Sequence, residues 1–383
     1  MMDARGLTTQ SIDHIAEVPA AEWNALADHD HFYQSHEWLS LIERDNTAEA
    51  RYVLVRNSDG IVGALALYEV AHEANASYRL ERLEASLGIR AGHLLAGGRR
   101  GYHSDLLICD QFAPELADRV ADALITEALD VAAGLGHAGL GMFCLPTDAV
   151  RRLARVRAVT ASFDTAESIV QPTGGGIEGY LADRTSKQRA KIRREMRAFD
   201  DTGWSVRAAP MTECLDVVSR LASNVERRYG HETPDVLLKR LLRREATHVG
   251  GQELTLICED LDGVPVACAV NYCWRDTMYS RVVGLDYERL GRSFAYFNVL
   301  LYRCIEAAAE RGLNRLSLGQ ATAPKVERGA ELRPLWMVSI AVDAGSARRT
   351  GLQLTDAAAL SRWSEPFADY REAMAEFDLR LLK

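Results

Sequence analysis

The chain has 383 residues, of which 48% are hydrophobic and 26% charged, a composition typical of a globular protein with room for two domains. Its net charge of −9 argues against a protein that coats DNA, and we expect no DNA partner. No apolar run approaches the roughly 18–20 residues that a membrane helix needs, and the first residues lack the apolar core of a signal peptide. We therefore expect a cytoplasmic location and no membrane span.

Cysteine and histidine usage predicts neither disulfides nor a metal site. The seven cysteines are scattered, odd in number and never spaced as CxxC, which favours reduced thiols. His29, His31 and His36 lie close together, but no tetrahedral ligand set is completed nearby, so we expect no metal. Ser35 is instead predicted to cap the helix that follows it.

Two distant segments share one hairpin pattern. Residues 53–68 and 254–272 each begin with an apolar strand and continue, after Asp-Gly, into a strand of alternating small apolar residues. Asp-Gly suits a tight hairpin turn in which both central residues have positive φ. Asp59-Gly60 and Asp262-Gly263 therefore predict the turns of two β-hairpins.

Each hairpin is followed by a strand, a helix and another strand. In the first half these are predicted at 106–110, 114–133 and 140–145, and in the second at 278–286, about 293–311 and 315–319. A strand–helix–strand crossover implies parallel pairing of its strands. The predicted fold class is therefore α+β, with two domains in tandem, each a mixed sheet with packed helices.

The boundary between the two domains is predicted at 171–185, where a Gly-Gly-Gly run is typical of a linker. We expect an N-terminal domain at 1–170 and a C-terminal domain at 186–353. Residues 354–383 are rich in helix formers and are expected to pack as a helical tail.

A concentrated basic segment, SKQRAKIRREMRAF at 186–199, contains six Lys or Arg and one Glu. Helical spacing puts Ile192, Met196 and Phe199 on one face, with Asp183 or Thr185 as a candidate cap. The cations form two rows, of Arg189, Arg193 and Arg197 and of Lys187, Lys191 and Arg194. Their mutual repulsion would be relieved by a polyanion, although a merely solvated helix face fits the same pattern.

Three segments together resemble a known family. FYQSHEWLSLIE at 32–43, the basic segment from Thr185 to Phe199, and residues 287–330, which end in LGQATAPKVERGA, are similar to tandem GNAT proteins of the Fem-like aminoacyl- and acyltransferase type. The resemblance implies two GNAT-like domains and transfer of an acyl or aminoacyl group to an amine. It implies no tightly bound cofactor, with aminoacyl-tRNA or acyl-CoA as the donor substrate.

The segment that would bind coenzyme A departs from the GNAT pattern. In CoA-dependent members, a Q/R-x-x-G-x-G/A loop opens a helix whose backbone N–H groups hold the pyrophosphate. Here residues 289–295 have one glycine, out of register, and a bulky Phe294. This favours aminoacyl-tRNA as donor. Candidate donor-binding residues are Lys187, Arg189, Lys191, Arg193, Arg197, Arg292, Ser293, Asn298 and Gln320, with an ordinary turn and N-cap as the alternative for Arg292 and Ser293.

Acyl transfer to an amine needs positioning, deprotonation of the amine and stabilisation of an oxyanion. Candidate groups lie where the parallel strands of the second domain would separate: Arg281 and Asp286 on one strand, with Gln320 and Lys325 beyond the other. Lys325 is the first choice, as a cation for the oxyanion, against the alternative of a surface lysine. Tyr302 is a further catalytic candidate, or else a core aromatic.

Candidate acceptor-binding residues come from both halves: His103, Asp105, Glu226, Tyr229 and Tyr296. The run His103-Ser104-Asp105 suggests a catalytic triad. Adjacent residues of an extended chain point to opposite faces, however, so these three cannot form a relay among themselves.

The function predicted from the resemblance is amide formation by transfer of an aminoacyl group from aminoacyl-tRNA to an amine. No long helical-hairpin insertion is present, which favours a small-molecule or peptide acceptor in specialised biosynthesis over peptidoglycan. Two alternatives stay open: an acyl-CoA-dependent N-acyltransferase, and a non-catalytic GNAT-like binding module.

Overall fold

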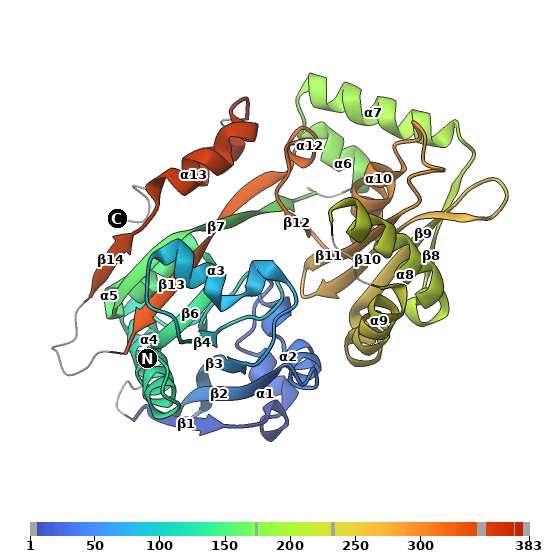
Figure 1. The fold of residues 1–383 in the computed structure, drawn as a ribbon. Coiled ribbons are helices and arrows are strands. Elements are labelled where there is room, and N and C mark those ends of the chain that lie inside the picture. The colour runs from blue at the N-terminus through green and yellow to red at the C-terminus, as the bar shows by residue number, and fades with distance from the viewer. Residues whose placement is uncertain (1–5, 173–174, 231–233, 343–349, 371, 378–383) are drawn as a thin grey trace. The chain divides into compact units, whose positions relative to one another are not determined.

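The computed structural model describes residues 6–172, 175–230, 234–342, 350–370 and 372–377. Its internal contacts divide the chain into two compact units, one formed by residues 1–166 and 333–383 and the other by residues 167–332. Each unit combines a β-sheet with packed helices, so the predicted α+β class is confirmed (Figure 1).

Unit 1 is built on a sheet with the strand order β1-β2-β3-β4-β6-β13-β7. β4 and β6 run parallel, β14 is added parallel to β7, and β5 pairs with β3. Its elements are β1 (Thr8–Ile12), α1 (Ala20–Asn24), α2 (His36–Glu43), β2 (Ala48–Asn57), β3 (Gly60–Val70), α3 (Leu80–Leu87), β4 (His93–Ala96), β5 (Leu107–Ile108), α4 (Pro114–Gly134), β6 (Gly139–Pro146), α5 (Thr147–Val156), β7 (Ala158–Val170), β13 (Glu331–Ala341), β14 (Gly351–Leu354) and α13 (Ala357–Ser364).

Unit 2 is built on the strand order β12-β11-β10-β9-β8, with the end of β7 antiparallel to β12. Its elements are α6 (Gly176–Ala182), α7 (Ser186–Asp200), β8 (Ser205–Ala209), α8 (Met211–Arg228), α9 (Asp235–Val249), β9 (Glu253–Glu259), β10 (Pro265–Trp274), β11 (Thr277–Leu285), α10 (Ala295–Phe297), the π-helical turn η5 (Asn298–Tyr302), α11 (Arg303–Glu310), β12 (Arg315–Gln320) and α12 (Ala323–Val326). β7 and β13 each have residues in both units.

Both predicted hairpins are present, as β2–β3 and β9–β10. The expected turn geometry is wrong in detail, because Gly60 and Gly263 adopt positive φ while Asp59 and Asp262 do not. The aspartates serve these turns differently. Asp59 and Asp262 donate their backbone N–H groups to the side chains of Asn57 and Asp260, and these bonds close the loops.

Both predicted crossovers exist, with one correction. In unit 2, β11 and β12 are parallel and joined by a helix, as expected. In unit 1, the strand that pairs in parallel with β6 is β4. The predicted strand at 106–110 is reduced to the two residues of β5, which pair antiparallel with β3. The four residues of β4 are too few to show an alternating pattern.

The helix between β11 and β12, called the crossover helix below, begins at Ala295, two residues later than predicted, and runs to Glu310. Its second turn is π-helical, from Asn298 to Tyr302. Phe294 precedes the helix in the left-handed conformation, with φ of 56°, which is strained for a bulky residue.

The segment predicted as a linker is partly helical. Within 171–185, α6 buries Tyr180 and Leu181 in the core of unit 2, while residues 173–174 lie outside the described part. Residues 333–353, which we expected in the second domain, group with unit 1, except that 343–349 lie outside the described residues. The expected helical tail contains α13 and two short 3₁₀ turns, and its residues 371 and 378–383 also lie outside the described part.

All seven cysteines are free thiols. Burial raises the pKa of Cys258, Cys268 and Cys304 to about 12, which makes these thiols poor nucleophiles at neutral pH.

In the described part of the chain, no helix is long and apolar enough to cross a membrane.

Candidate functional site in the second unit

The parallel strands of unit 2 separate, as predicted. Pairing between β11 and β12 covers Thr277–Arg315 to Tyr279–Ser317, after which the two strands continue without pairing with each other. Gly319, with φ of 67°, turns β12 away at this point. The crossover helix and α12 begin beyond the two strand ends, so their side chains can converge there.

The centre of the site is a buried ion pair between α7 and the residues after α12. Nη2 and Nε of Arg328 donate to Oε1 and Oε2 of Glu195 over 2.6 and 2.8 Å. The Glu195 side chain is 1% exposed and the Arg328 side chain 5%. A bidentate geometry with both carboxylate oxygens satisfied is what makes such buried charges tolerable.

Two predicted residues of the crossover helix meet the same glutamate. The Tyr302 hydroxyl donates to Glu195 Oε2 over 2.6 Å, and Asn298 Nδ2 donates to the Glu195 backbone carbonyl over 3.3 Å. Burial and the neighbouring carboxylate raise the pKa of Tyr302 well above its usual range. The phenol therefore stays protonated and serves as a donor to Glu195, which ties α7 to the π-helical turn.

Arg328 also holds the surrounding segments together. Its guanidinium stacks 3.3 Å above the Phe297 ring, and Nη1 donates to the Pro324 carbonyl over 2.5 Å. The Arg328 carbonyl accepts a hydrogen bond from the Tyr180 hydroxyl. Residues of α6, α7, α12 and the crossover helix thus share one polar centre.

Lys325, the first catalytic candidate, is not a surface lysine. It lies on α12, is 7% exposed, and its Nζ donates over 2.7 Å to each of the carbonyls of Leu318 and Gln320. Burial lowers the pKa of Lys325 to about 8, against a smaller opposing effect of Glu167. The ammonium group therefore lies at the end of β12, where the strands have separated, and Gln320 contributes its backbone rather than its exposed side chain.

The basic segment forms α7 and is capped as predicted. Thr185 is the N-cap and forms a capping box with Gln188, and Ile192 and Phe199 are buried. Among the described residues, the exposed side chains of Lys187, Arg194 and Arg197 have no ion-pair partner. Three cations do have contacts: Arg193 lies 3.4 Å from Glu178, Lys191 pairs with Glu327, and Arg189 donates to the Arg184 carbonyl.

At the start of the crossover helix, the candidates Arg292 and Ser293 lie in different surroundings. Ser293 is buried and its hydroxyl accepts from the Ala295 N–H over 3.2 Å, so it supports the turn rather than serving as the N-cap. Phe294 is the residue at the N-cap position. Arg292 is exposed, next to this helix start.

Arg281 and Asp286 contact the helices that cover β11. The Arg281 guanidinium lies 3.5 Å from Glu245 on α9. Asp286 lies 3.7 Å from Arg220 on α8 and 4.0 Å from Arg289. The two residues are thus anchored to α8 and α9, whereas Lys325 and Tyr302 belong to the group around Arg328.

The acceptor candidates of unit 2 lie in one neighbourhood. Tyr296 is partly buried, and burial, with smaller effects of Tyr229 and Tyr287, raises its pKa to about 12. Tyr229, at the end of α8, is 72% exposed, and Glu226 lies one turn before it. Tyr296, on the crossover helix, therefore lies near Tyr229 at the end of α8.

The unit 1 candidates have structural surroundings. His103 is buried, with φ of 59°, and Ser104 accepts a hydrogen bond from the Gly98 N–H. Asp105 exchanges backbone hydrogen bonds with the Gln34 side chain, and burial raises its pKa. These hydrogen bonds tie Ser104 and Asp105 to neighbouring segments of unit 1.

Glu195 and Arg328 were both missed as site residues. The basic segment did contain a signal for Glu195. This residue lies three positions after Ile192 and four before Phe199, so helical spacing places it in the apolar stripe. A charged residue in the apolar stripe of a helix needs a buried partner of opposite charge. Arg328 itself, far away in the sequence, carries no local signal.

In the described residues, no cluster of three or more His, Cys, Asp or Glu side chains is arranged to hold a metal ion. The three nearby histidines have separate neighbours. His31 lies 2.8 Å from Asp28, His29 lies 3.5 Å from Asp30, and His36 contacts the carbonyls of residues 15 and 18.

Comparison with known proteins agrees with this architecture. Residues 186–324 match the family model of the acetyltransferase (GNAT) domain, which assigns this part of the chain to the acyltransferase class. No curated protein sequence matches the chain. The matched domain lies within unit 2, and the fold of the chain resembles that of a Fem-type protein, as the solved structures below illustrate.

Two solved structures illustrate the fold. The crystal structure of FemX is similar over 86% of this chain and 97% of its own, with a TM-score of 0.61 and 12% sequence identity. A conserved protein of unknown function from Bacteroides thetaiotaomicron VPI-5482 is similar over 87% of this chain and 100% of its own, with a TM-score of 0.57 and 12% identity. At these identities the likeness concerns the fold.

Proposed function

We propose that the chain moves an aminoacyl group from aminoacyl-tRNA to the amine of a small-molecule or peptide acceptor and so forms an amide, in specialised biosynthesis in the cytoplasm. The substrate amine attacks the aminoacyl ester directly, the amine proton is transferred away, and the tRNA 3′-hydroxyl leaves. No protein nucleophile is needed, so the protein contributes positioning and charge.

The observation that carries this proposal is the charge distribution of α7. The helix buries one of its two acidic residues, Glu195, against Arg328 and leaves Lys187, Arg193, Arg194 and Arg197 exposed. We call these four exposed side chains the basic surface. Each phosphate contact made by such cations adds affinity through counterion release, so a surface of this width suits the acceptor arm of a tRNA better than one nucleotide phosphate.

The basic surface is also coupled to the reaction region. Glu195 on the opposite side of α7 binds Asn298 and Tyr302, which lie on the crossover helix beyond the separated strands. A donor held on α7 is therefore positioned relative to the end of β12. Arg189 and Lys191 flank the basic surface, and Arg292 and Gln320 lie near the proposed path of the donor.

Within this proposal, Lys325 supplies positive charge for the developing oxyanion, since its ammonium group lies at the end of β12. Tyr302 has a positioning role, because its hydroxyl is used by Glu195. Arg281 and Asp286 act from β11, and Tyr296, Tyr229 and Glu226 contribute to the acceptor side. For His103 and Asp105, in unit 1, we propose a contact with the acceptor.

The second candidate function is acyl-CoA-dependent N-acylation. It is favoured by the acetyltransferase domain that matches residues 186–324. In this case Arg292 and Ser293, at the start of the crossover helix, would lie near the donor phosphates.

The experiment that separates the two candidates offers each donor in parallel. Purified protein receives a panel of amines with either total tRNA, synthetases and radiolabelled amino acids, or radiolabelled acyl-CoA. We expect labelled amide only in the tRNA reaction, and we expect ribonuclease pretreatment to abolish it. Ribonuclease-resistant product from acyl-CoA alone would overturn the tRNA proposal in favour of the second candidate. Product from neither donor would favour a non-catalytic binding module.

A further inference from the structure

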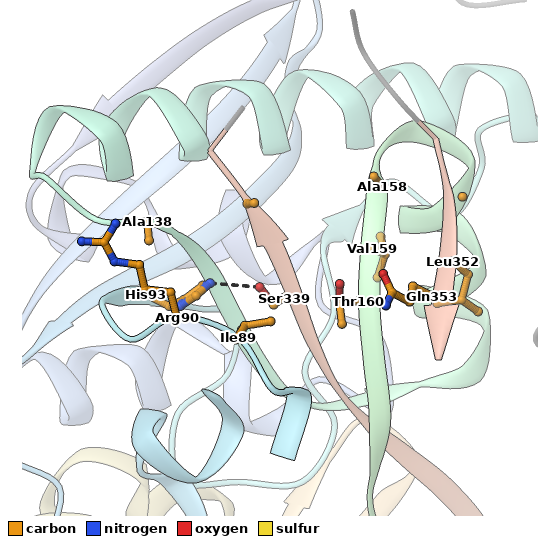
Figure 2. A pocket seen from close by; sticks show the side chains of 12 residues that line it. Ile89, Arg90, His93, Ala138, Ala158, Val159, Thr160, Ser339, Leu352 and Gln353 are labelled. Atoms are coloured by element: carbon orange, nitrogen blue, oxygen red, sulfur yellow. Dashed lines mark hydrogen bonds between the residues drawn. The ribbon is translucent and has the colours of Figure 1, made fainter. Parts of the chain in front are cut away.

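Unit 1 contains a pocket of about 430 Å³ lined by residues of β4 and β13 on one side and of β7 and β14 on the other (Figure 2). This volume falls within the roughly 300–1,000 Å³ of small-molecule sites. Ile89, Val159 and Leu352 supply apolar walls. His93 and Ser339 line it together, and the function proposed above makes no use of them.

Glu84, on the last turn of α3, fixes His93. Its Oε1 accepts three hydrogen bonds: from the backbone N–H groups of Gly92 and His93, at 2.7 and 3.0 Å, and from the His93 ring at 3.1 Å. A carboxylate oxygen accepts only, so Nδ1 of His93 carries the proton that it donates. In the neutral imidazole, Nε2 is then left as a hydrogen-bond acceptor.

Ser339 supplies the proton for that acceptor. The distance between Ser339 Oγ and His93 Nε2 is 3.0 Å (Figure 2). Ser339 is 5% exposed, and His93 and Glu84 are each 6% exposed. A hydroxyl bonded to an imidazole that is oriented by a carboxylate is the arrangement that activates a serine as nucleophile.

Gly139 makes this geometry possible. It pairs with His93 on β4 and with Ala341 on β13, so β6 lies between the histidine and the strand of Ser339. A Cβ atom at Gly139 would lie 3.1 Å from His93 Cδ2 and 2.4 Å from the Ile340 carbonyl. The absent side chain leaves room for the imidazole to cross β6 and reach Ser339.

We propose that Ser339 is a nucleophile, with His93 as its base and Glu84 as the residue that positions His93, and that the pocket accepts the acyl group of a short apolar ester or thioester. Ser339 Oγ forms a bond to the acyl carbon while its proton passes to His93 Nε2. The bond to the alcohol or thiol then breaks, and His93 returns the proton to this leaving group. Water, activated by the same imidazole, later releases the acid and restores Ser339.

The opposite wall of the pocket offers hydrogen-bond donors for the oxyanion. Thr160 on β7 and Gln353 on β14 direct their side chains toward the pocket from the side that faces Ser339 (Figure 2). Among the described residues, neither side chain has a hydrogen-bond partner of its own. A hydroxyl and an amide N–H are both suitable groups for an oxyanion hole.

The test uses the full chain and an alkyl fluorophosphonate, which phosphonylates activated serines with loss of fluoride. We expect peptide mapping by mass spectrometry to find the label on Ser339 in the folded protein. Ser339→Ala should lose the label, and His93→Gln should slow labelling by about 10²-fold or more, the usual contribution of a general base. Ser162→Ala, at a buried serine outside the pocket lining, is the matched control and should label at the wild-type rate.

A second measurement follows release of p-nitrophenol from p-nitrophenyl acetate. The wild type should show it and Ser339→Ala should not, with both proteins unfolding at similar temperatures, because this substitution removes a single oxygen. Labelling confined to other residues would overturn the proposal, as would equal rates in wild type and His93→Gln. Both outcomes test the chemistry of unit 1 only. The transfer reaction proposed for unit 2 is tested separately, by the donor experiment described above.

Discussion

Arg328 donates two hydrogen bonds to the Glu195 carboxylate within unit 2, although the two residues are 133 positions apart in the sequence. Tyr302 adds a third bond to the same carboxylate. The buried acid of a strongly basic helix is thus the group that fastens this helix to the crossover helix and to the segment after β12. The four cations of the basic surface are left exposed to solvent.

Breaking this buried pair should destabilise unit 2. Arg328→Met keeps the side-chain volume but leaves the Glu195 charge buried without its cation, which costs about 3–5 kcal/mol in comparable cases. Arg193→Ala, which removes a pair with an exposed Glu178 at 3.4 Å, should cost less than about 1 kcal/mol. The free energy of unfolding in urea measures both, and equal values for the two variants would contradict a central role for the pair.

Reversing charge on the basic surface should weaken donor binding in a salt-dependent way. We expect Lys187→Glu with Arg197→Glu to lower the affinity for aminoacyl-tRNA and to reduce the slope of log affinity against log salt by about 1 per lost phosphate contact. Arg240→Glu with Arg243→Glu on α9 changes the net charge equally and should leave the slope unchanged. The slope is read from binding titrations at several salt concentrations. Identical slopes in the two double variants would refute donor binding at α7.

Lys325 should make stability depend on pH in the alkaline range. Burial lowers the pKa of Lys325 in the folded protein to about 8 from 10.5. Between these values the unfolded chain binds a proton that the folded chain has released, so the free energy of unfolding rises with pH. Over this pH range the free energy of unfolding should rise by about 3 kcal/mol in total. Urea titrations from pH 7 to 10.5, compared with Lys325→Met, measure the effect, and parallel curves would contradict the burial of a titrating amine.

Gly284 on β11 should tolerate no side chain. A Cβ atom there would lie 2.6 Å from both Cys268 Sγ and Leu221 Cβ, and 2.8 Å from the Ala222 backbone nitrogen of α8. Gly284→Ala should therefore destabilise by about 1–3 kcal/mol, the usual cost of overpacking. Gly134→Ala, where nothing lies within 4 Å, should be neutral or slightly stabilising, as judged by thermal unfolding. A neutral Gly284→Ala would show that α8 packs less closely on the sheet.

Local patterns predicted the elements of the fold well. The Asp-Gly turns marked both hairpins, and helical spacing marked α4 and α7 because each is long and has one apolar face. The segment at 171–185 failed because three glycines outweighed the two apolar residues, Tyr180 and Leu181, that α6 buries. A glycine run does not indicate a linker where the burial of neighbouring apolar side chains offsets the conformational entropy that the glycines lose on folding.

Candidate site residues were proposed from the sequence only where they lie on predicted elements. Asn298, Tyr302 and Lys325 were identified because they lie near the ends of a predicted strand and helix. Their shared partners were not, since the Glu195–Arg328 contact is set by the packing of α7 on the crossover helix, which no local spacing encodes. The same holds in unit 1, where the sequence drew attention to adjacent His103 and Ser104. The relay of Glu84, His93 and Ser339 is assembled from α3, β4 and β13.

The π-helical turn at Asn298–Tyr302 makes the crossover helix sensitive to the number of its residues rather than to their kind. This turn holds one residue more than a regular helical turn does, so the parts before and after it are out of phase. Inserting a further residue there would rotate everything downstream by about 100° about the helix axis. Ile305 and Ala308 would leave the core while Tyr302 lost Glu195. Point substitutions can therefore be accommodated in this helix, but an added residue within it would disrupt the anchor of α7 and the core beneath α11 together.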